Sequence, residues 1–255
     1  MGETLLSILI SAGQGTDAIV VAEKSAERAD VLRGTYGVEV TDSPTAVRGA
    51  DLVLIVVKPQ DVAELLAEVA SDIESGATVV SFAAGVRLAT LEAGLAPETA
   101  VIRVMPNTPA LVGEGMFGAS PGSACTSDRL DEITKLLSAG GRVRVIDESL
   151  QDILTAVSGS GPAYVFYLAE AMAAGGMEGG LDAETARELT TQTIVGAAKL
   201  LAESDVDATE LRRRVTSPKG TTAEAIATFD ERGVMSAIAA GVLAAARRSE
   251  ELSGA

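Results

Sequence analysis

The stretch Leu52–Val57, with the sequence LVLIVV, is the strongest strand pattern in the chain. A run of six aliphatic residues with no polar residue is typical of a β-strand that is buried on both sides. Lys58-Pro59 ends the run, and apolar residues at helical spacing follow over Asp61–Ile73. The stretch therefore predicts a buried strand followed by a helix.

The same order of strand and helix recurs on both sides of this stretch. Further strands are predicted at Ala18–Ala22, Ala77–Ala83, Ala100–Val104 and Val143–Ile146, with helices at Ser25–Arg33, Leu88–Ala93 and Ser127–Ala139. Strands that alternate with helices form parallel sheets with helices on both faces, and ligands bind beyond the carboxyl ends of the strands. We therefore expect an α/β domain over residues 1–147.

The chain after Ile146 shows helical patterns only. They lie at Ser149–Val157, Ala163–Ala174, Ala183–Ala202, Asp207–Arg214, Thr222–Glu231 and Met235–Leu252, with breaks expected at Ser158–Pro162 and Gly175–Gly180. We therefore expect an all-α domain over residues 148–255. Its core would be modest at this length, so dimerisation is expected to complete it.

Composition excludes several classes of function. The net charge of −16 disfavours nucleic acid or an anionic membrane surface as a partner. The sequence has no histidine, which excludes a Ser-His-Asp triad and a histidine-ligated zinc site, and its single cysteine, Cys125, cannot form an internal disulfide. No apolar run approaches the ~18 residues of a membrane span, and no basic residue precedes the apolar Leu5–Ile10, so a cytoplasmic protein is expected.

The start of the sequence does not fit a dinucleotide-binding (Rossmann) fold. That fold opens with a strand, then Gly-x-Gly-x-x-Gly, then a helix, whereas here a helical pattern at Gly2–Ser11 comes first. Gly2 would then be the third glycine, with the first strand and first two glycines missing. Either the N-terminus is shortened or this domain never bound a dinucleotide. We favour the first alternative, because Ala18–Ala22 and Leu52–Val57 both have the character of central strands, which need a neighbour.

The turn at Ser217-Pro218-Lys219-Gly220 precedes a second informative helix. Pro218 fixes φ, Gly220 permits conformations that other residues resist, and Thr221 with Glu224 matches a capping box, which predicts a helix start. The free N–H groups and partial positive charge of a helix N-terminus suit a small anion such as a carboxylate. The alternative is a capped helix that binds nothing.

Three motifs resemble those of the pyrroline-5-carboxylate reductases. They are MPNTPALVGEG at Met105–Gly115, AVSGSGPAYVF at Ala156–Phe166 and VTSPKGTTAEA at Val215–Ala225. VVKP at Val56–Pro59 and AAG at Ala83–Gly85 lie where this family carries its AVKP and AAG cofactor segments. The resemblance extends over essentially the whole chain in order, and the three motifs at these separations are highly specific.

The resemblance implies an NAD(P)H-dependent reductase that converts 1-pyrroline-5-carboxylate to proline, the last step of proline synthesis. It also implies a Rossmann-like domain followed by a helical dimerisation domain, in an interleaved homodimer that can assemble further. NADPH is the family's usual cofactor. Reduction of a cyclic imine requires no metal and no covalent nucleophile, because the nicotinamide supplies the hydride, and this agrees with the missing histidines.

By the same resemblance, the substrate carboxylate lies at Ser217, Gly220 and Thr221. The Thr222 hydroxyl lies near the ring nitrogen as a donor or relay, unless it serves as a helix cap only. An acidic residue of the family falls at Asp205. Lys219 stands where the family commonly has glycine.

The cofactor-binding residues that the resemblance implies come from both halves of the chain. They are Gly2, Ser25, Ser43, Val56, Val57, Lys58, Pro59, Ala84, Gly85 and Arg214. Ser25 is expected to meet the adenosine ribose or its 2′-phosphate, and Ala84 and Gly85 the nicotinamide or its ribose. Lys24 and Arg28 would favour NADPH, whereas Glu23 at a strand end is what NADH recognition uses, so NADH stays possible.

Two other functions are compatible with parts of this pattern. A non-catalytic or crippled dimeric binding protein would lack a complete dinucleotide loop, which the missing glycines would explain. A β-hydroxyacid dehydrogenase of the same architecture would carry a catalytic lysine on the inter-domain helix, and Ala163–Ala174 has none. The reductase is the function we expect.

Overall fold

The computed structural model describes residues 1–254 and divides the chain into two compact units. The first unit comprises residues 1–160 together with the end of the chain from Ala245 onward, and the second is Gly161–Ala244.

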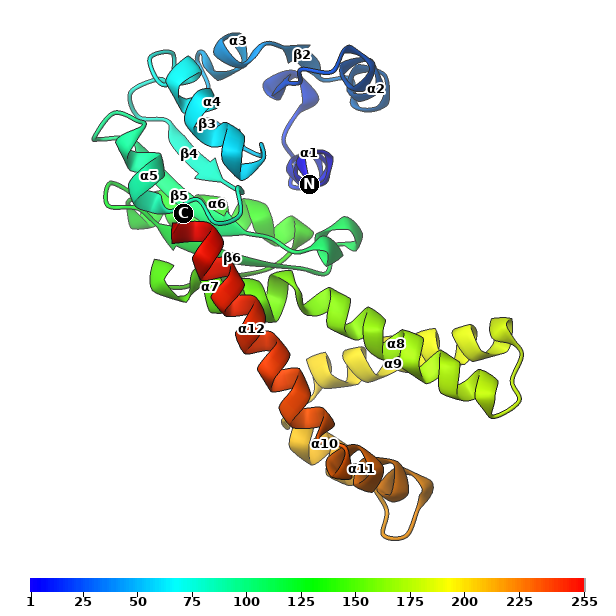
Figure 1. Cartoon of the computed structure of the whole chain (residues 1–255). Helices are drawn as coiled ribbons and strands as arrows, with labels where there is room; N and C mark the ends of the chain where they lie inside the picture. The colour runs from blue at the N-terminus through cyan, green and yellow to red at the C-terminus, as the bar shows by residue number, and fades with distance from the viewer. Residues whose placement is uncertain (255) are drawn as a thin grey trace. The chain divides into compact units, whose positions relative to one another are not determined.

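The first unit is an α/β unit with two sheets. Its strands are β1 (Val20–Ala22), β2 (Glu39–Thr41), β3 (Leu52–Ile55), β4 (Thr78–Ser81), β5 (Ala100–Met105), β6 (Gly115–Pro121) and β7 (Gly141–Val145). β1 and β2 form one parallel pair, and the other five strands form a sheet in the order β3-β4-β5-β6-β7 (Figure 1). β3, β4 and β5 are parallel, with Val53 opposite Val79 and Val79 opposite Val101. The predicted parallel sheet is thus confirmed for these three strands.

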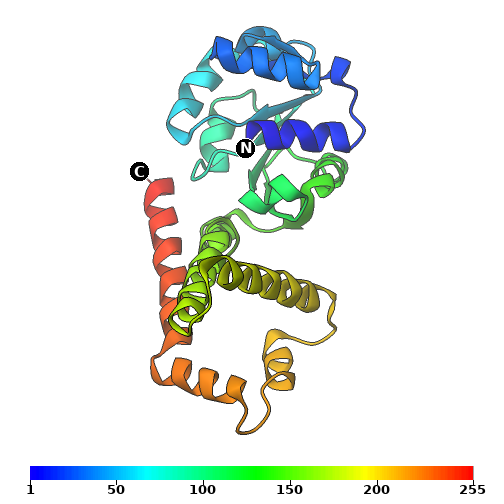
Figure 2. The same cartoon turned by 90° about the vertical axis from the view of Figure 1, so that its right-hand side faces the viewer.

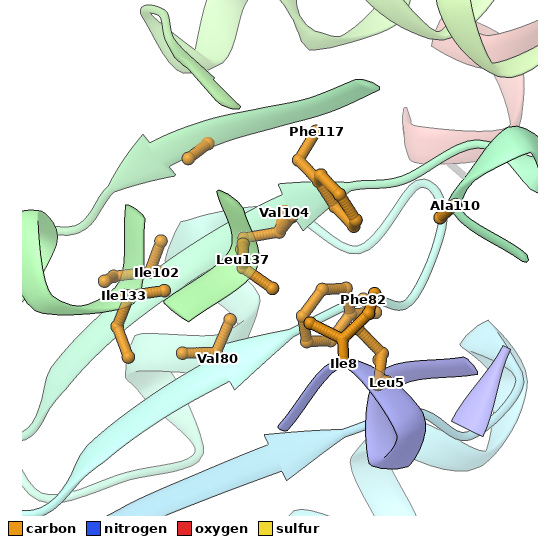
Figure 3. Packing of buried hydrophobic residues seen from close by; sticks show 11 residues of the cluster. Leu5, Ile8, Val80, Phe82, Ile102, Val104, Ala110, Phe117, Ile133 and Leu137 are labelled. Carbon is orange, nitrogen blue, oxygen red and sulfur yellow. The ribbon is translucent and has the colours of Figure 1, made fainter. Parts of the chain in front are cut away.

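Helices cover both faces of the larger sheet. The helices of this unit are α1 (Gly2–Ser11), α2 (Ala26–Tyr36), α3 (Ser43–Val47), α4 (Val62–Val69), α5 (Leu88–Ala93), α6 (Ser127–Leu137) and α7 (Gln151–Leu154). On one face, side chains of α1 and α6 pack on Val80, Ile102 and Phe117 of the sheet (Figure 3). On the other face, α4 and α5 pack on the alternate residues Val79 and Val101. This alternation is what a strand with successive side chains on opposite faces produces.

β1 and β3 are not paired with each other. They lie in separate sheets, and an open cavity of about 2230 Å³ is bordered by both strands and by α1. The sequence predicted that both strands are central and need a neighbour. Within residues 1–254, β1 and β3 each have one edge without a strand partner on the side of the cavity.

The second unit consists of helices. The helices are α8 (Gly161–Glu178), α9 (Ala183–Glu203), α10 (Ala208–Arg214), α11 (Thr221–Glu231) and α12 (Val234–Gly254), the last of which continues into the first unit. α8 and α9 pack against each other (Figure 2), and Ala186 and Thr190 on α9 are the only buried residues assigned to these helices within residues 161–254. No helix among residues 1–254 is long and apolar enough to cross a membrane.

Four differences from the sequence prediction concern strands and helix breaks. β2 and β6 were not predicted, and β6 runs antiparallel to β5. β6 contains glycine because Leu154 packs on it: an ideal Cβ on Gly118 would lie 2.2 Å from Leu154 Cδ1. The predicted break at Ser158–Pro162 is instead a π-helix, η6 (Thr155–Gly159), that leads into α8.

The fourth difference is in α8, which continues through the predicted break at Gly175 and ends at Glu178. Gly176 faces the next helix, where an ideal Cβ would lie 3.2 Å from Leu181 Cδ1 and 3.5 Å from Ala186 Cβ. Gly176 therefore allows close helix packing rather than ending the helix.

Candidate functional site

The cavity between β1 and β3 brings together half of the predicted cofactor residues. Gly2, Ser43, Val56, Val57 and Lys58 all border it. An ideal Cβ on Gly2 would lie 4.0 Å from Val56 Cγ1, so the first turn of α1 faces the residues that follow β3.

The N-terminus of α1 carries no side-chain cap. Met1, Gly2 and Glu3 at this helix start border the same cavity as Lys58, and uncapped N–H groups with a positive helix end suit a pyrophosphate. The residues present in this part of the unit thus fit a dinucleotide.

The segment after β1 begins α2. Ser25 is its N-cap, and the Ser25 Oγ accepts a hydrogen bond from the Arg28 N–H at 3.3 Å. The Ser25 N–H donates to Glu23 Oε1 at 2.8 Å. Glu23 and Lys24 border the cavity, whereas Ser25 itself does not. The Ser25 hydroxyl therefore already serves the helix start, and its hydrogen stays available for a further acceptor.

Arg28 is held by the first turn of α1. It donates to the Glu3 carboxylate, which also accepts from the Tyr36 hydroxyl at 2.9 Å. The Arg28 hydrogen bond and then the Tyr36 hydrogen bond lower the pKa of Glu3. The bond to Glu3 in turn raises the pKa of Tyr36. Of the two cations predicted for NADPH, only Lys24 lacks an ion pair among residues 1–254.

The loop after β4 contains the predicted Ala84 and Gly85. Gly85 has φ of 76°, a left-handed conformation that favours glycine. Further along, Glu148 Oε1 accepts from the Leu88 N–H at 2.6 Å and from Arg103 Nη1 at 3.0 Å. Ala84 and Gly85 do not border the cavity, and neither do the predicted cofactor residues Ser25 and Pro59. By accepting from both Leu88 and the buried Arg103, Glu148 connects the start of α5 to β5.

Asn107 lies in the MPNTP motif, and no role was predicted for it from the sequence. Its Nδ2 donates to the Ser158 carbonyl oxygen at 3.2 Å, and its Oδ1 accepts from the Met116 N–H at 2.9 Å. Asn107 thus joins the loop after β5 to η6, the π-helix whose last two residues are the first two of the SGSGP motif. Two of the motifs quoted from the sequence are therefore in direct contact, and π-helices of this kind are frequent at functional sites.

The turn before α11 forms where the sequence predicted it, but the unusual backbone conformation falls on Lys219 and not on Gly220, whose φ is −83°. The Gly220 N–H donates to the Ser217 carbonyl oxygen at 3.0 Å, with Pro218 in second position and Lys219 at φ of 59° in third. This is the pattern of a type II turn, in which glycine is usual at the third position. Lys219 is the only non-glycine residue with positive φ within residues 1–254.

The capping-box prediction at Thr221 and Glu224 is wrong. Gly220 is the N-cap of α11, and no side chain caps the helix. Thr221 is already the first helical residue, so its hydroxyl lies one position too late to serve as the cap. The first N–H groups of α11 therefore keep their capacity to bind an anion.

The two remaining predicted residues lie near α10. Arg214 Nε donates to Glu210 Oε1 at 2.9 Å, and Arg213 donates to the same carboxylate. These two partners, with Arg213 first, lower the pKa of Glu210 to about 2. Asp205 is exposed in the loop before α10. The structure leaves Asp205 open to solvent and places Arg214 in an ion pair.

Comparison with known proteins connects both units to one family. The family described as pyrroline-5-carboxylate reductase dimerisation matches residues 148–252, and that described as NADP oxidoreductase coenzyme F420-dependent matches residues 1–85. The pyrroline-5-carboxylate reductase of Corynebacterium melassecola is 40% identical over 256 residues, which cover 99% of this chain and 95% of the relative. That of Pseudomonas aeruginosa is 39% identical, covering 99% and 93%.

Solved structures of reductases of the same name are also similar to this chain. A pyrroline-5-carboxylate reductase from Coxiella burnetii has a TM-score of 0.93 at 32% identity, covering 99% of this chain and 94% of that one. Pyrroline carboxylate reductase from Plasmodium falciparum, solved with NADP bound, has a TM-score of 0.88 at 26% identity, with the same coverage. On the identity and coverage of these relatives, the chain belongs to the pyrroline-5-carboxylate reductase family.

Proposed function

We propose that the chain catalyses the reduction of 1-pyrroline-5-carboxylate to L-proline, with NADPH as the hydride donor. The observation that carries this function is the 40% identity to reductases of this name over 99% of the chain. The MPNTP, SGSGP and SPKGTT motifs all lie within that aligned length. NADH is a possible second cofactor. The crippled binding protein is not favoured, because full-length relatives carry the enzyme's name.

The substrate carboxylate is proposed to bind at the start of α11. The type II turn at Ser217–Gly220 ends at a helix start without a side-chain cap, so the first N–H groups of the helix and its positive end lie at one point. A carboxylate fits such a site through charge-assisted hydrogen bonds, which are stronger than those to neutral acceptors. Ser217, Gly220 and Thr221 form this part of the site, and Asp205 belongs to it by resemblance only.

Thr222 is proposed as the residue next to the ring nitrogen. It is the second residue of α11 and is half-buried, and it does not cap its helix. A carboxylate held at the helix start fixes the ring orientation, and a hydroxyl can then donate a hydrogen bond to nitrogen or relay a proton to it. The alternative for Thr222 is a structural role at the helix start.

The cofactor supplies the hydride when it is bound. Gly2 and the free N–H groups of α1 are proposed to hold its pyrophosphate, with Val56, Val57, Lys58 and Pro59 beside it. Ser25, Ser43 and Lys24 are proposed to bind the adenosine end, and Ala84 and Gly85 to border the nicotinamide. Arg214 is assigned to the cofactor by resemblance, and it would have to share its charge with Glu210.

The protein forms a homo-oligomer, for which a dimer through the helical domain is proposed. Phe166 and Tyr167 of α8 are 63% and 75% exposed, and α8 has no buried residue. Large apolar side chains exposed at adjacent helix positions indicate an interface, because exposed surfaces of this kind are rare in monomers. We propose functional domains over residues 1–147 and 148–255, in agreement with the family match at 148–252, and a cytoplasmic location.

The experiment is an assay of NADPH oxidation with 1-pyrroline-5-carboxylate, run with wild-type protein and with Thr222→Ala and Thr222→Ser. We expect Thr222→Ala to lower kcat/KM by about 10²-fold, the lower range for loss of a general acid, and Thr222→Ser to keep most of the activity. Matching urea unfolding curves would show that the variants are folded. Unchanged kinetics in Thr222→Ala would remove Thr222 from the mechanism, and no turnover by the wild type would contradict the proposed function.

A further inference from the structure

The last two turns of α12 belong to the first unit and carry a stripe of small residues. Ala245, Ala246, Ser249 and Ser253 are half-buried, whereas the residues between them, such as Arg248, are exposed. Positions separated by three or four residues share one face of a helix, so this stripe is the face that contacts the unit.

One carboxylate holds this stripe. Ser249 Oγ donates to Asp152 Oδ1 at 2.6 Å, and Ser253 Oγ lies 3.1 Å from the same oxygen. The Ser253 hydroxyl also lies 2.7 Å from the Ser249 carbonyl oxygen, so its one hydrogen is shared between two acceptors. Asp152 lies on α7, about 100 positions earlier in the chain. A charged acceptor thus joins α7 to two successive turns of α12.

The turn held in this way lies close to Gly85. An ideal Cβ on Gly85 would lie 3.5 Å from Ser253 Oγ and 3.6 Å from the Leu252 carbonyl oxygen. The end of α12 (red in Figure 1) therefore lies where a side chain at position 85 would extend, within van der Waals distance of such a Cβ. Gly85 is in the left-handed conformation, with φ of 76°, and the Val86 N–H donates across it to the Ala83 carbonyl oxygen at 3.4 Å.

We propose that Asp152, Ser249 and Ser253 form a clasp that fixes the backbone of Ala84 and Gly85 for binding of the nicotinamide. The proposal rests on the proposed function, which puts the nicotinamide beside these two residues. A loop that is already ordered loses less conformational entropy when it binds a ligand, so the clasp increases cofactor affinity without contacting the cofactor. Asp152 and the two serines are positioning residues in this scheme.

Hydrogen exchange tests the clasp without any need for activity. The variants are Asp152→Ala and the double variant Ser249→Ala/Ser253→Ala, and the double variant keeps the charge on α7. Ser236→Ala is the matched control, because Ser236 lies on the same helix and its hydroxyl bonds only its own turn, to the Gly233 carbonyl oxygen. We expect amide exchange at Gly85 and Val86 to become about tenfold faster in both clasp variants, and to be unchanged in Ser236→Ala.

Kinetics provide the second measurement. We expect KM for NADPH to rise about tenfold in both clasp variants, while kcat changes less than about twofold and KM for the imine substrate is unchanged. Wild-type exchange at Gly85 in the clasp variants would overturn the proposal, as would faster exchange with an unchanged KM for NADPH. Equal effects of Ser236→Ala would also overturn it. Absence of turnover in the wild type would contradict the proposed function instead, and the exchange measurement would then decide the clasp alone.

Discussion

Arg28 on α2 donates a hydrogen bond to the carboxylate of Glu3, which lies in the first turn of α1. The pair connects the helix at the proposed pyrophosphate site with the helix at the proposed adenosine site. It also pairs Arg28, which is one of the two cations predicted to interact with a 2′-phosphate, the other being Lys24. Glu3 should therefore lower the preference for NADPH over NADH.

Replacing Glu3 by Gln tests this relationship. The amide carries no charge, so Arg28 becomes free to interact with a 2′-phosphate near Ser25. We expect the ratio of kcat/KM for NADPH to that for NADH to rise about two- to fivefold, the range for a partly exposed ion pair. Tyr36→Phe is the control, because it removes the other hydrogen bond to the same carboxylate and leaves the ion pair. A ratio that stays at the wild-type value in Glu3→Gln would show that Arg28 does not contribute to the choice.

Lys219→Gly should stabilise the protein. Lys219 adopts φ of 59° at the third position of a type II turn, a conformation that costs a non-glycine residue about 1–2 kcal/mol. The extra backbone freedom of glycine in the unfolded chain offsets about 0.5–1 kcal/mol of the gain. We expect the free energy of unfolding in urea to rise by about 0.5–1 kcal/mol. Lys199→Gly, in the interior of α9, should lower it by about 1 kcal/mol. A loss of stability in Lys219→Gly would contradict the turn geometry.

Glu210 should make α10 sensitive to acid. Its folded-state pKa of about 2 lies below the ordinary value of 4.5, because Arg213 and Arg214 donate to it. A depressed pKa means that the stabilisation is fully present above about pH 4.5 and is lost as the pH falls through about 2. Carboxyl NMR titration should place the Glu210 midpoint near 2. Glu210→Gln should remove this part of the pH dependence of stability, and Glu188→Gln, on exposed α9, should not. A midpoint near 4.5 would mean that the ion pairs do not form in solution.

Because a cavity separates β1 from β3, we predict that a strand added between them stabilises the first unit. Both strands have an unpaired edge there, and apolar side chains of α1 border the cavity. We expect a fused segment of about five alternating valine and isoleucine residues, joined to Met1 by a glycine-containing turn, to raise Tm by several degrees. The same segment with two prolines cannot pair with both edges and should have no effect. Equal melting temperatures for the two fusions would show that no strand enters the space.

The sequence predicted the elements whose residues carry a strong local pattern. LVLIVV became β3, and Gly2–Ser11 and Leu88–Ala93 became α1 and α5 with the predicted bounds. β6 was missed because its glycines are explained only by tertiary packing. Gly118 lies against Leu154, which is 36 positions later, and Gly115 lies against Ala110 and Gly140. The break predicted over Gly175–Gly180 begins only after Glu178, because the packing of Gly176 against Leu181 and Ala186 overrides a weak helix propensity.

The candidate site was predictable to a similar extent. The motifs indicated which segments take part, and the cavity does bring Gly2 to Val56. They could not indicate that Arg28 is paired with Glu3, or that Asn107 joins two motifs, because these contacts depend on how α1 and η6 pack. Thr221 was predicted as the N-cap only because it precedes Glu224 by three positions. The helix begins one position earlier than that prediction requires, so Gly220 is the N-cap.

The most direct test of the reductase function follows the hydride itself. 1-Pyrroline-5-carboxylate is incubated with NADPH that carries deuterium on one face of nicotinamide C4, in separate reactions for the two faces, and the proline is analysed by mass spectrometry. The account predicts one deuterium on carbon 5 of proline from one of the two labelled cofactors, and none at that carbon when unlabelled NADPH is used in deuterated water. Absence of proline, or proline without deuterium from either cofactor, would contradict it.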